Sequence, residues 1–213
     1  MKRKIYQELL DWKKTGMKKP LMIIGARQIG KTYIVNEFCN NEFDNYVYIN
    51  LLEHSEIVKI FKEEISTSEK YKRMKIYLNN DIDVKNTIIF FDEVQECKEI
   101  ITAIKFLVDE GSYKYVMSGS LLGVELDNLR SVPVGYMDEI EMYPLDLLEF
   151  FEAIGIGTDV ISHLRTCFED KRPVDAFIHK RMLEALRLYL IVGGMPAAVQ
   201  KYLDTNNLRR VYE

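Results

Sequence analysis

The chain has 213 residues, of which 47% are hydrophobic and 29% are charged. These proportions are typical of a globular protein of one domain or slightly more, and a chain of this length buries a sizeable core without disulfides or metals. The composition excludes a disordered chain and a small disulfide-stapled scaffold. The net charge of −4 hides a basic run at residues 1–20 and an acidic run at 131–164, and we expect both to be solvated helix faces.

Targeting and metal signals are missing from the sequence. No apolar run approaches the ~20 residues that span a bilayer, and the basic N-terminus lacks the apolar core of a signal peptide. The three cysteines are far apart and form no C-x-x-C pair, so neither a disulfide framework nor a zinc site is indicated. One short basic patch in an acidic chain is not the footprint of a nucleic-acid binder. We expect a cytoplasmic protein without direct membrane or nucleic-acid contact.

The first two thirds of the chain predict strands that alternate with helices. Helical periodicity predicts helices at 2–14, from about 30, and at 53–62, 68–78 and 100–108. Short apolar runs predict strands at 21–24, 46–49, 87–91, 114–117 and 138–143. The run at 87–91 is continuously apolar, which is typical of a parallel sheet covered by helices on both faces. This alternation predicts an α/β fold built from βαβ units.

Strand signals stop near Pro144. The remaining segments predict helices, interrupted by glycine or proline, at 145–154, 160–168, 174–189 and 197–203. We therefore predict an α/β domain at 1–150 and a helical domain at 151–213.

A glycine-rich loop follows the first predicted strand and matches G-x-x-x-x-G-K-[ST] at every fixed position. Such a loop curls its backbone N–H groups round a phosphate at a helix N-terminus. Lys31 would reach the β- and γ-phosphates and Thr32 would ligate Mg²⁺. A glycine-rich turn that only connects strand to helix is the alternative. The candidate nucleotide-binding residues are Gly25, Ala26, Arg27, Gln28, Ile29, Gly30, Lys31, Thr32 and Tyr33.

Two later strand ends carry polar side chains that fit the same chemistry. Asp92 follows the apolar strand at 87–91 and can hold Mg²⁺ or its waters, while Glu93 can activate the water that attacks the γ-phosphate. A Ser-Gly-Ser sequence ends the strand at 114–117, and Ser120, or as second choice Ser118, can place a hydroxyl near the γ-phosphate. The alternatives are a helix start for the acidic pair and ordinary turn chemistry for the serines.

Five motifs together resemble AAA+ P-loop ATPases, and more closely a prokaryotic group of them. They read G-A-R-Q-x-G-K-T at 25–32, D-E-x-Q at 92–95, G-S at 119–120, Y-P-L at 143–145 and G-G-M-P at 193–196. The resemblance implies a three-layer α/β/α P-loop NTPase fold with a parallel sheet ordered 5-1-4-3-2, and a small all-helical lid after Pro144. It also implies a further, nuclease-like C-terminal domain, so we expect the polar stretch up to Glu213 to belong to a longer chain.

The resemblance predicts an ATPase that uses ATP and Mg²⁺. Arg130 is the arginine nearest to the position from which such proteins reach a neighbouring subunit's γ-phosphate, and capping a helix is its alternative role. No N-K-x-D motif is present, which favours ATP over GTP. We expect ATP hydrolysis that drives or gates a protein partner, with self-association as a further expectation. A nucleotide-gated interaction module with little turnover is the rival, and a small-molecule kinase is a weaker third hypothesis.

Overall fold

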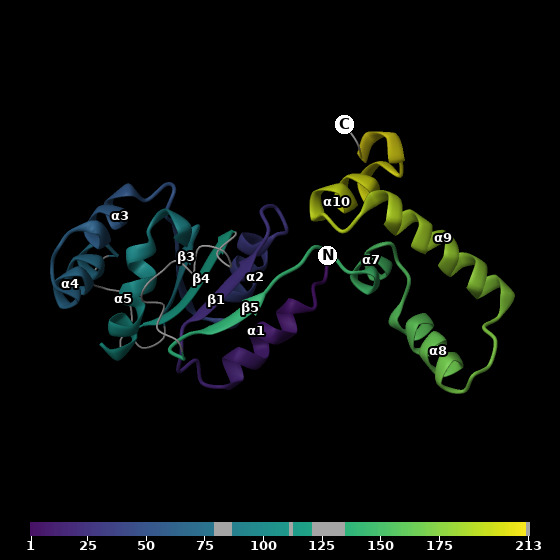
Figure 1. The fold of residues 1–213 in the computed structure, drawn as a ribbon, viewed down its shortest axis with the longest axis horizontal. Helices are drawn as coiled ribbons and strands as arrows, with labels where there is room; N and C mark the ends of the chain where they lie inside the picture. Colours follow the sequence, from purple (N-terminus) through teal and green to yellow (C-terminus); the bar gives the residue numbers. More distant parts are fainter. Residues whose placement is uncertain (79–86, 111–112, 121–134, 212–213) are drawn as a thin grey trace. The chain divides into compact units, whose positions relative to one another are not determined.

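A computed structural model of the chain describes residues 1–78, 87–110, 113–120 and 135–211 (Figure 1). The chain forms two compact units, which we call the α/β unit, Ile5–Met142, and the helical unit, which combines Met1–Lys4 with Tyr143–Glu213. The division falls between Met142 and Tyr143, compared with residue 150 expected from the sequence, because the segment after Met142 already packs among the later helices. The chain crosses between the units twice, after Lys4 and after Met142.

The α/β unit is built on a five-stranded parallel sheet. Its order is β2-β3-β4-β1-β5, so the predicted order 5-1-4-3-2 is confirmed. The strands are β1 Leu21–Gly25, β2 Asn45–Asn50, β3 Thr87–Asp92, β4 Lys114–Ser120 and β5 Asp138–Glu141. The helical segments are α1 Ile5–Lys14, α2 Lys31–Glu42, α3 Ser55–Lys62, α4 Thr67–Tyr77, the 3-10 turn η1 Val94–Glu96, and α5 Lys98–Asp109.

Helices cover both faces of this sheet, which makes the predicted three-layer α/β/α arrangement (Figure 1). Successive strand residues point to opposite faces. One set packs with α3, α4 and α5 and includes Met22, Ile49, Ile89, Phe91 and Met117. The other face meets α2, whose fully buried Phe38 also contacts two aromatic rings of α1. Burying apolar side chains on both faces contributes about 1.5–3 kcal/mol for each large residue.

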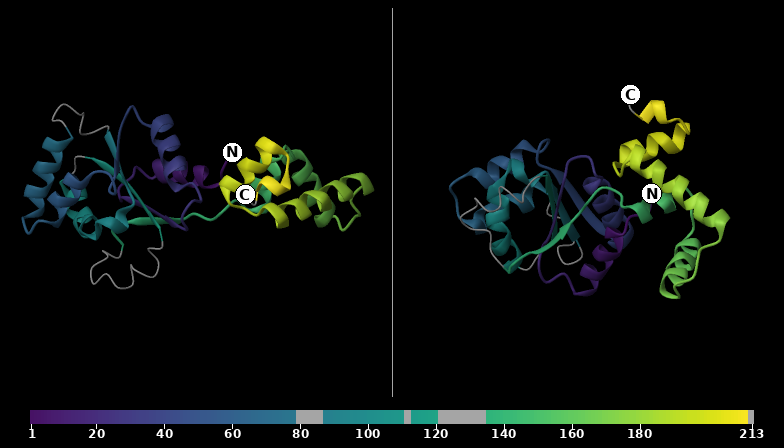
Figure 2. Two further views of the ribbon diagram at one scale, coloured as in Figure 1. Left: turned by 90° about the horizontal axis from the view of Figure 1, so that it is seen from above. Right: turned by 45° about the vertical axis from the view of Figure 1, so that its right-hand side comes forward.

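The helical unit contains α7 Leu147–Ala153, α8 Thr158–Glu169, α9 Ala176–Val192, α10 Pro196–Thr205 and the 3-10 turn η2 Leu208–Val211 (green to yellow in Figure 2). Its core is small and consists of Leu145, Phe150, Phe151, Ile156, Ala185, Val192 and Val199. Asp146 begins α7 with a reciprocal capping box to Glu149. None of the helices in the described ranges is both long and apolar enough to cross a bilayer.

The Y-P-L and G-G-M-P motifs meet inside the helical unit. The Leu145 N–H donates to the Gly194 carbonyl oxygen at 2.7 Å, and the Tyr189 hydroxyl donates to the Leu145 carbonyl oxygen at 3.0 Å. A Cβ added to Gly194 would lie 2.2 Å from the Leu145 carbonyl oxygen. Only glycine therefore allows the two segments to approach so closely, which gives the two motifs a structural role.

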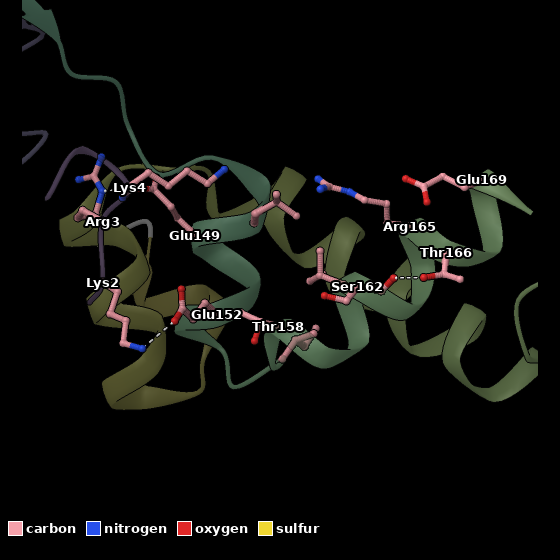
Figure 3. A pocket seen from close by; sticks show the side chains of 13 residues that line it. Lys2, Arg3, Lys4, Glu149, Glu152, Thr158, Ser162, Arg165, Thr166 and Glu169 are labelled. Atoms are coloured by element: carbon pink, nitrogen blue, oxygen red, sulfur yellow. Dashed lines mark hydrogen bonds and ion pairs between the residues drawn. The ribbon is translucent and has the colours of Figure 1, made fainter. Parts of the chain in front are cut away.

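The first four residues bind to the acidic side of α7 (Figure 3). Three successive basic residues pair with acidic residues that are three positions apart: Lys2 with Glu152, Arg3 with Glu149 and Lys4 with Asp146. The side chains of Arg3 and Glu149 are each only 8% exposed, with Nε and Oε1 3.2 Å apart. The prediction that both charge runs are purely solvated helix faces is therefore wrong, because residues 2–4 of the basic run form ion pairs with acidic residues of the other run. Five of these six residues, all except Asp146, line a cavity of about 520 Å³ that extends along α8.

Candidate functional site

The loop between β1 and α2 has positive φ angles and a close backbone approach that require glycine. Gly25 has φ +152°, and a Cβ added there would lie 2.3 Å from the Met142 carbonyl oxygen and 2.7 Å from Ile29 Cδ1. Gly30, the N-cap of α2, has φ +92°, a conformation that side-chain-bearing residues rarely adopt. Gln28 also has a positive φ, 64°. The loop therefore curls tightly into the N-terminus of α2, the geometry that binds anions.

Lys31 is the cation of this loop and is only 7% exposed. Its Nζ donates to the carbonyl oxygens of Gly25 at 3.0 Å and Ala26 at 2.7 Å. Burial lowers the pKa of Lys31, against the opposing attraction of the Asp92 and Glu93 carboxylates. Within the described ranges the ammonium makes no ion pair. An incoming anion would supply the charge that this buried cation lacks.

Asp92 ends β3, is 2% exposed, and accepts four hydrogen bonds. Oδ2 accepts from the Thr32 hydroxyl at 2.7 Å and the Tyr48 hydroxyl at 3.1 Å. Oδ1 accepts from the Ser118 hydroxyl and from the Glu93 N–H, the latter at 3.1 Å. Four donors match the acceptor capacity of one carboxylate, so Asp92 is fixed in position. Burial raises the pKa of Tyr48 and keeps this phenol a donor.

The Thr32–Asp92 pair fits a magnesium ion that is completed by phosphate and water oxygens. The Thr32 hydroxyl donates a hydrogen bond to Asp92, which leaves the lone pairs of its oxygen available for a cation. Asp92 would hold Mg²⁺ or one of the waters that this ion retains after one of its four present donors gives way. The described residues contain no group of three or more His, Cys, Asp or Glu side chains that could hold a metal by themselves. The donor set therefore suits Mg²⁺ that arrives with a phosphate ligand.

Glu93 directly follows β3 and adopts a left-handed backbone, φ 58° and ψ 46°. Its carboxylate accepts a hydrogen bond from the Gln95 side-chain amide. The Gln95 Oε1 in turn accepts from the backbone N–H of Ser120 at 3.3 Å, and the Ser120 hydroxyl accepts from Arg27 Nε at 3.4 Å. A chain of contacts thus links the acidic residue, the end of β4 and the glycine-rich loop.

Parallel strands explain why these groups meet. Gly25 and Ser120 are register partners at the ends of β1 and β4, and β3 ends beside them with Asp92. Carboxyl ends of parallel strands meet at one edge of the sheet, where ligands of such folds bind. Ser118 is fully buried and its hydroxyl is committed to Asp92, so Ser120 is the better placed of the two serines for a ligand.

The remaining predicted site residues, Tyr33 and Arg130, are not brought into these contacts by the described part of the structure. Tyr33 is 63% exposed on the first turn of α2, and Arg130 lies outside the described residues. Sequence reasoning gave no role to Tyr48 or Gln95. Tyr48 could have been found from strand alternation, since it shares a face with Asn50, the register partner of Asp92. Gln95 is the last residue of the D-E-x-Q motif at 92–95, and that motif was the signal for it.

The geometry agrees with comparisons to known proteins. A family model described as AAA domain matches residues 17–151, which include the loop, the strand ends and all five strands. The chain belongs to this AAA domain family. Membership implies that the AAA domain described here binds a nucleotide.

Two individual proteins are similar to this AAA domain. An uncharacterized protein of Methanocaldococcus jannaschii is 26% identical over 194 residues, which are 89% of this chain and 38% of the relative. The chain thus spans well under half of the length of that relative. The solved structure of a Walker-type ATPase of Pyrococcus abyssi has a TM-score of 0.55 and 16% identity, with 99% of this chain and 70% of that chain covered. This second likeness shows a shared fold.

Proposed function

We propose that this AAA domain binds ATP with Mg²⁺ and hydrolyses it at the carboxyl edge of its sheet. The observation that carries the proposal is the pair of contacts at the start of α2. Buried Lys31 has only carbonyl partners in the loop, and Thr32 is joined to the buried Asp92 at 2.7 Å. The first provides a cation for phosphate oxygens, and the second a threonine–carboxylate pair for the metal.

Each residue of the candidate site then has a definite role in binding or hydrolysis. The N–H groups of the curled loop and the Lys31 ammonium bind the phosphates, while Thr32 and Asp92 hold the metal, which supplies charge neutralisation when bound. Glu93 orients a water molecule and accepts its proton as the water oxygen bonds to the γ-phosphorus. The bond from the γ-phosphorus to the bridging oxygen breaks, leaving ADP and inorganic phosphate. Arg27 and Ser120, whose Nε and Oγ atoms are 3.4 Å apart, would bind γ-phosphate oxygens.

Nucleotide binding and steady-state phosphate release test this proposal together. The parent chain should bind ATP in the presence of Mg²⁺ and release phosphate over many turnovers. Lys31→Ala should lose ATP affinity, because the cation that balances the phosphate charge is gone. Equal ATP affinity in Lys31→Ala and the parent would contradict the site. A parent that binds ATP tightly but releases no phosphate would leave binding intact and contradict hydrolysis.

A nucleotide-gated interaction module is the second candidate function, and one observation favours it. The chain leaves the α/β unit directly after Met142, whose carbonyl oxygen lies against Gly25 of the loop and whose N–H donates to the Ile24 carbonyl oxygen at 2.8 Å. A nucleotide that orders the loop therefore acts next to one of the two chain crossings. We propose that the helical unit, residues 143–211, responds to nucleotide as a lid.

Hydrogen exchange with a non-hydrolysable ATP analogue and Mg²⁺ distinguishes a lid from an independent module. Exchange should slow at residues 25–32 and also within 180–203. Protection confined to the loop and the end of β3 would contradict the lid, because the helical unit would then not respond to nucleotide. It would leave the hydrolysis proposal untouched, because that proposal concerns the α/β unit alone.

A further inference from the structure

We propose that Gln95 is the positioning residue for Glu93, an inference that rests on the proposed hydrolysis. The side-chain amide of Gln95 donates to Glu93 Oε2, and its Oε1 accepts from the Ser120 N–H at 3.3 Å. One carboxamide therefore ties the water-activating carboxylate to the end of β4. Ser120 is the register partner of Gly25, where the phosphate-binding loop begins.

The backbone of Glu93 is fixed independently of its side chain. Its N–H donates to Asp92 Oδ1 at 3.1 Å, and its carbonyl oxygen accepts from the Glu96 N–H at 3.0 Å. Among the described residues, Gln95 is the hydrogen-bond partner found for the Glu93 carboxylate. Without Gln95 the main chain would stay in place while the carboxylate would be free to rotate about the side-chain bonds. A freed glutamate side chain populates several rotamers, most of which misplace the base.

The amide of Gln95 satisfies both partners in one orientation. The Glu93 carboxylate accepts hydrogen bonds and the Ser120 N–H donates one, so the position needs one donor and one acceptor on the same side chain. A carboxylate at position 95 would face the Glu93 carboxylate with like charge. An aliphatic side chain of the same size would leave both partners unbound. The chemistry of the position therefore selects glutamine.

Single substitutions separate positioning from a general structural role. Gln95→Leu keeps the volume and removes both hydrogen bonds, so kcat should fall about 10- to 100-fold while the ATP dissociation constant and the melting temperature stay unchanged. Gln95→Glu should lower kcat at least as far. Gln7→Leu is the matched control, because the Gln7 amide donates to the Asp11 carboxylate on the exposed face of α1, away from the site. That control should leave kcat unaltered.

A double mutant decides whether Gln95 acts through Glu93. In the Glu93→Gln background, which lacks the base, adding Gln95→Leu should cause no further loss of kcat, because the group it positions is already inactive. Equal and additive losses in both backgrounds would overturn the proposal. So would a Gln95→Leu variant that loses ATP affinity or melting temperature in proportion to its rate.

Failure of hydrolysis itself would be recognised separately. A parent chain that shows no turnover contradicts the proposed activity, and the contact can then be tested without turnover. The side-chain amide resonances of Gln95 in an NMR spectrum should shift strongly in Glu93→Ala and stay in place in a Glu99→Ala control, which lies on the next helix. Unchanged Gln95 resonances in Glu93→Ala would overturn the positioning role in either case.

Discussion

Two buried charges, Lys31 of the α/β unit and Glu149 of the helical unit, are balanced in opposite ways. In the helical unit, the buried Glu149 carboxylate binds the equally buried Arg3 side chain and the N–H groups of Lys4 and Asp146. In the α/β unit, buried Lys31 has no anionic partner at hydrogen-bonding distance among the described residues. A satisfied buried charge serves the fold, whereas a buried charge without a counter-ion costs stability and indicates a ligand.

The two units also differ in how they use apolar side chains. The central strands of the α/β unit, β3, β4 and most of β1, are buried, with Ile23, Ile89 and Phe90 at 0% exposure. The helical unit has a smaller core and exposes Phe168 at 85% and Phe177 at 73%. The larger core of the α/β unit packs around its sheet, whereas the smaller core of the helical unit is supplemented by the buried Arg3–Glu149 ion pair.

The largest expected effect comes from closing the tight contact at the phosphate loop. Gly25→Ala would place a Cβ 2.3 Å from the Met142 carbonyl oxygen, so we expect a loss of about 3 kcal/mol or more in unfolding free energy, together with loss of ATP binding. Gly16→Ala is the control, because Gly16 has φ +82° but open space around it, and should cost only about 1–2 kcal/mol. Urea unfolding measures both. Equal costs would show that contact with Met142 is unimportant.

Breaking the buried ion pair should destabilise the helical unit next most strongly. Arg3→Met leaves Glu149 without its cation, and we expect a loss of about 2–4 kcal/mol in the stability of that unit. Lys2→Met is the matched variant, since the Lys2 side chain is 86% exposed and its ion pair with Glu152 should contribute at most about 1 kcal/mol. Urea titration followed by hydrogen exchange in residues 147–169 separates the two variants. ATP affinity should stay the same in both.

Removing the buried cation of the α/β unit, in contrast to Arg3→Met, should not lower the stability of the nucleotide-free chain. Lys31→Met removes a cation whose pKa is lowered because it is buried, so the nucleotide-free chain should be unchanged or about 1 kcal/mol more stable. The same variant should lose the stabilisation that ATP gives the parent, which is about 2.7 kcal/mol at a ligand concentration of 100 Kd. Thermal unfolding with and without ATP measures both effects. A strongly destabilised nucleotide-free variant would make Lys31 a structural residue like Arg3.

A smaller effect should appear in the pH dependence of ATP binding. Burial lowers the pKa of Lys31, so the free chain loses this ammonium charge at a lower pH than an exposed lysine does. ATP binds the charged form, so affinity should decline as pH rises through the lowered pKa, with uptake of a proton on binding in that range. Calorimetry in buffers of different ionisation enthalpy detects the proton. Lys31→Arg, which stays charged, should show neither the decline nor the uptake.

The sequence predicted the sheet and the phosphate loop but not the contacts that hold the site together. The loop motif is local, and the apolar strands have clear ends, so these features follow from neighbouring residues. A turn was the alternative for the serines at 118 and 120, but they continue β4, because pairing beside β1 outweighs the turn preference of Ser-Gly-Ser. The Tyr48–Asp92, Gln95–Ser120 and Arg3–Glu149 contacts join residues far apart in the chain and depend on strand register and packing, which one sequence does not reveal.

If Glu93 serves the chemical step while the loop serves binding, Glu93→Gln should separate the rate of hydrolysis from the affinity for ATP. ATP affinity with Mg²⁺ and steady-state phosphate release should be measured on the same two preparations. We expect equal ATP affinity and a rate lower by about 10²- to 10⁴-fold in Glu93→Gln, the range for loss of a positioned base. An unchanged rate of phosphate release, or a loss of ATP affinity as large as the loss of rate, would contradict it.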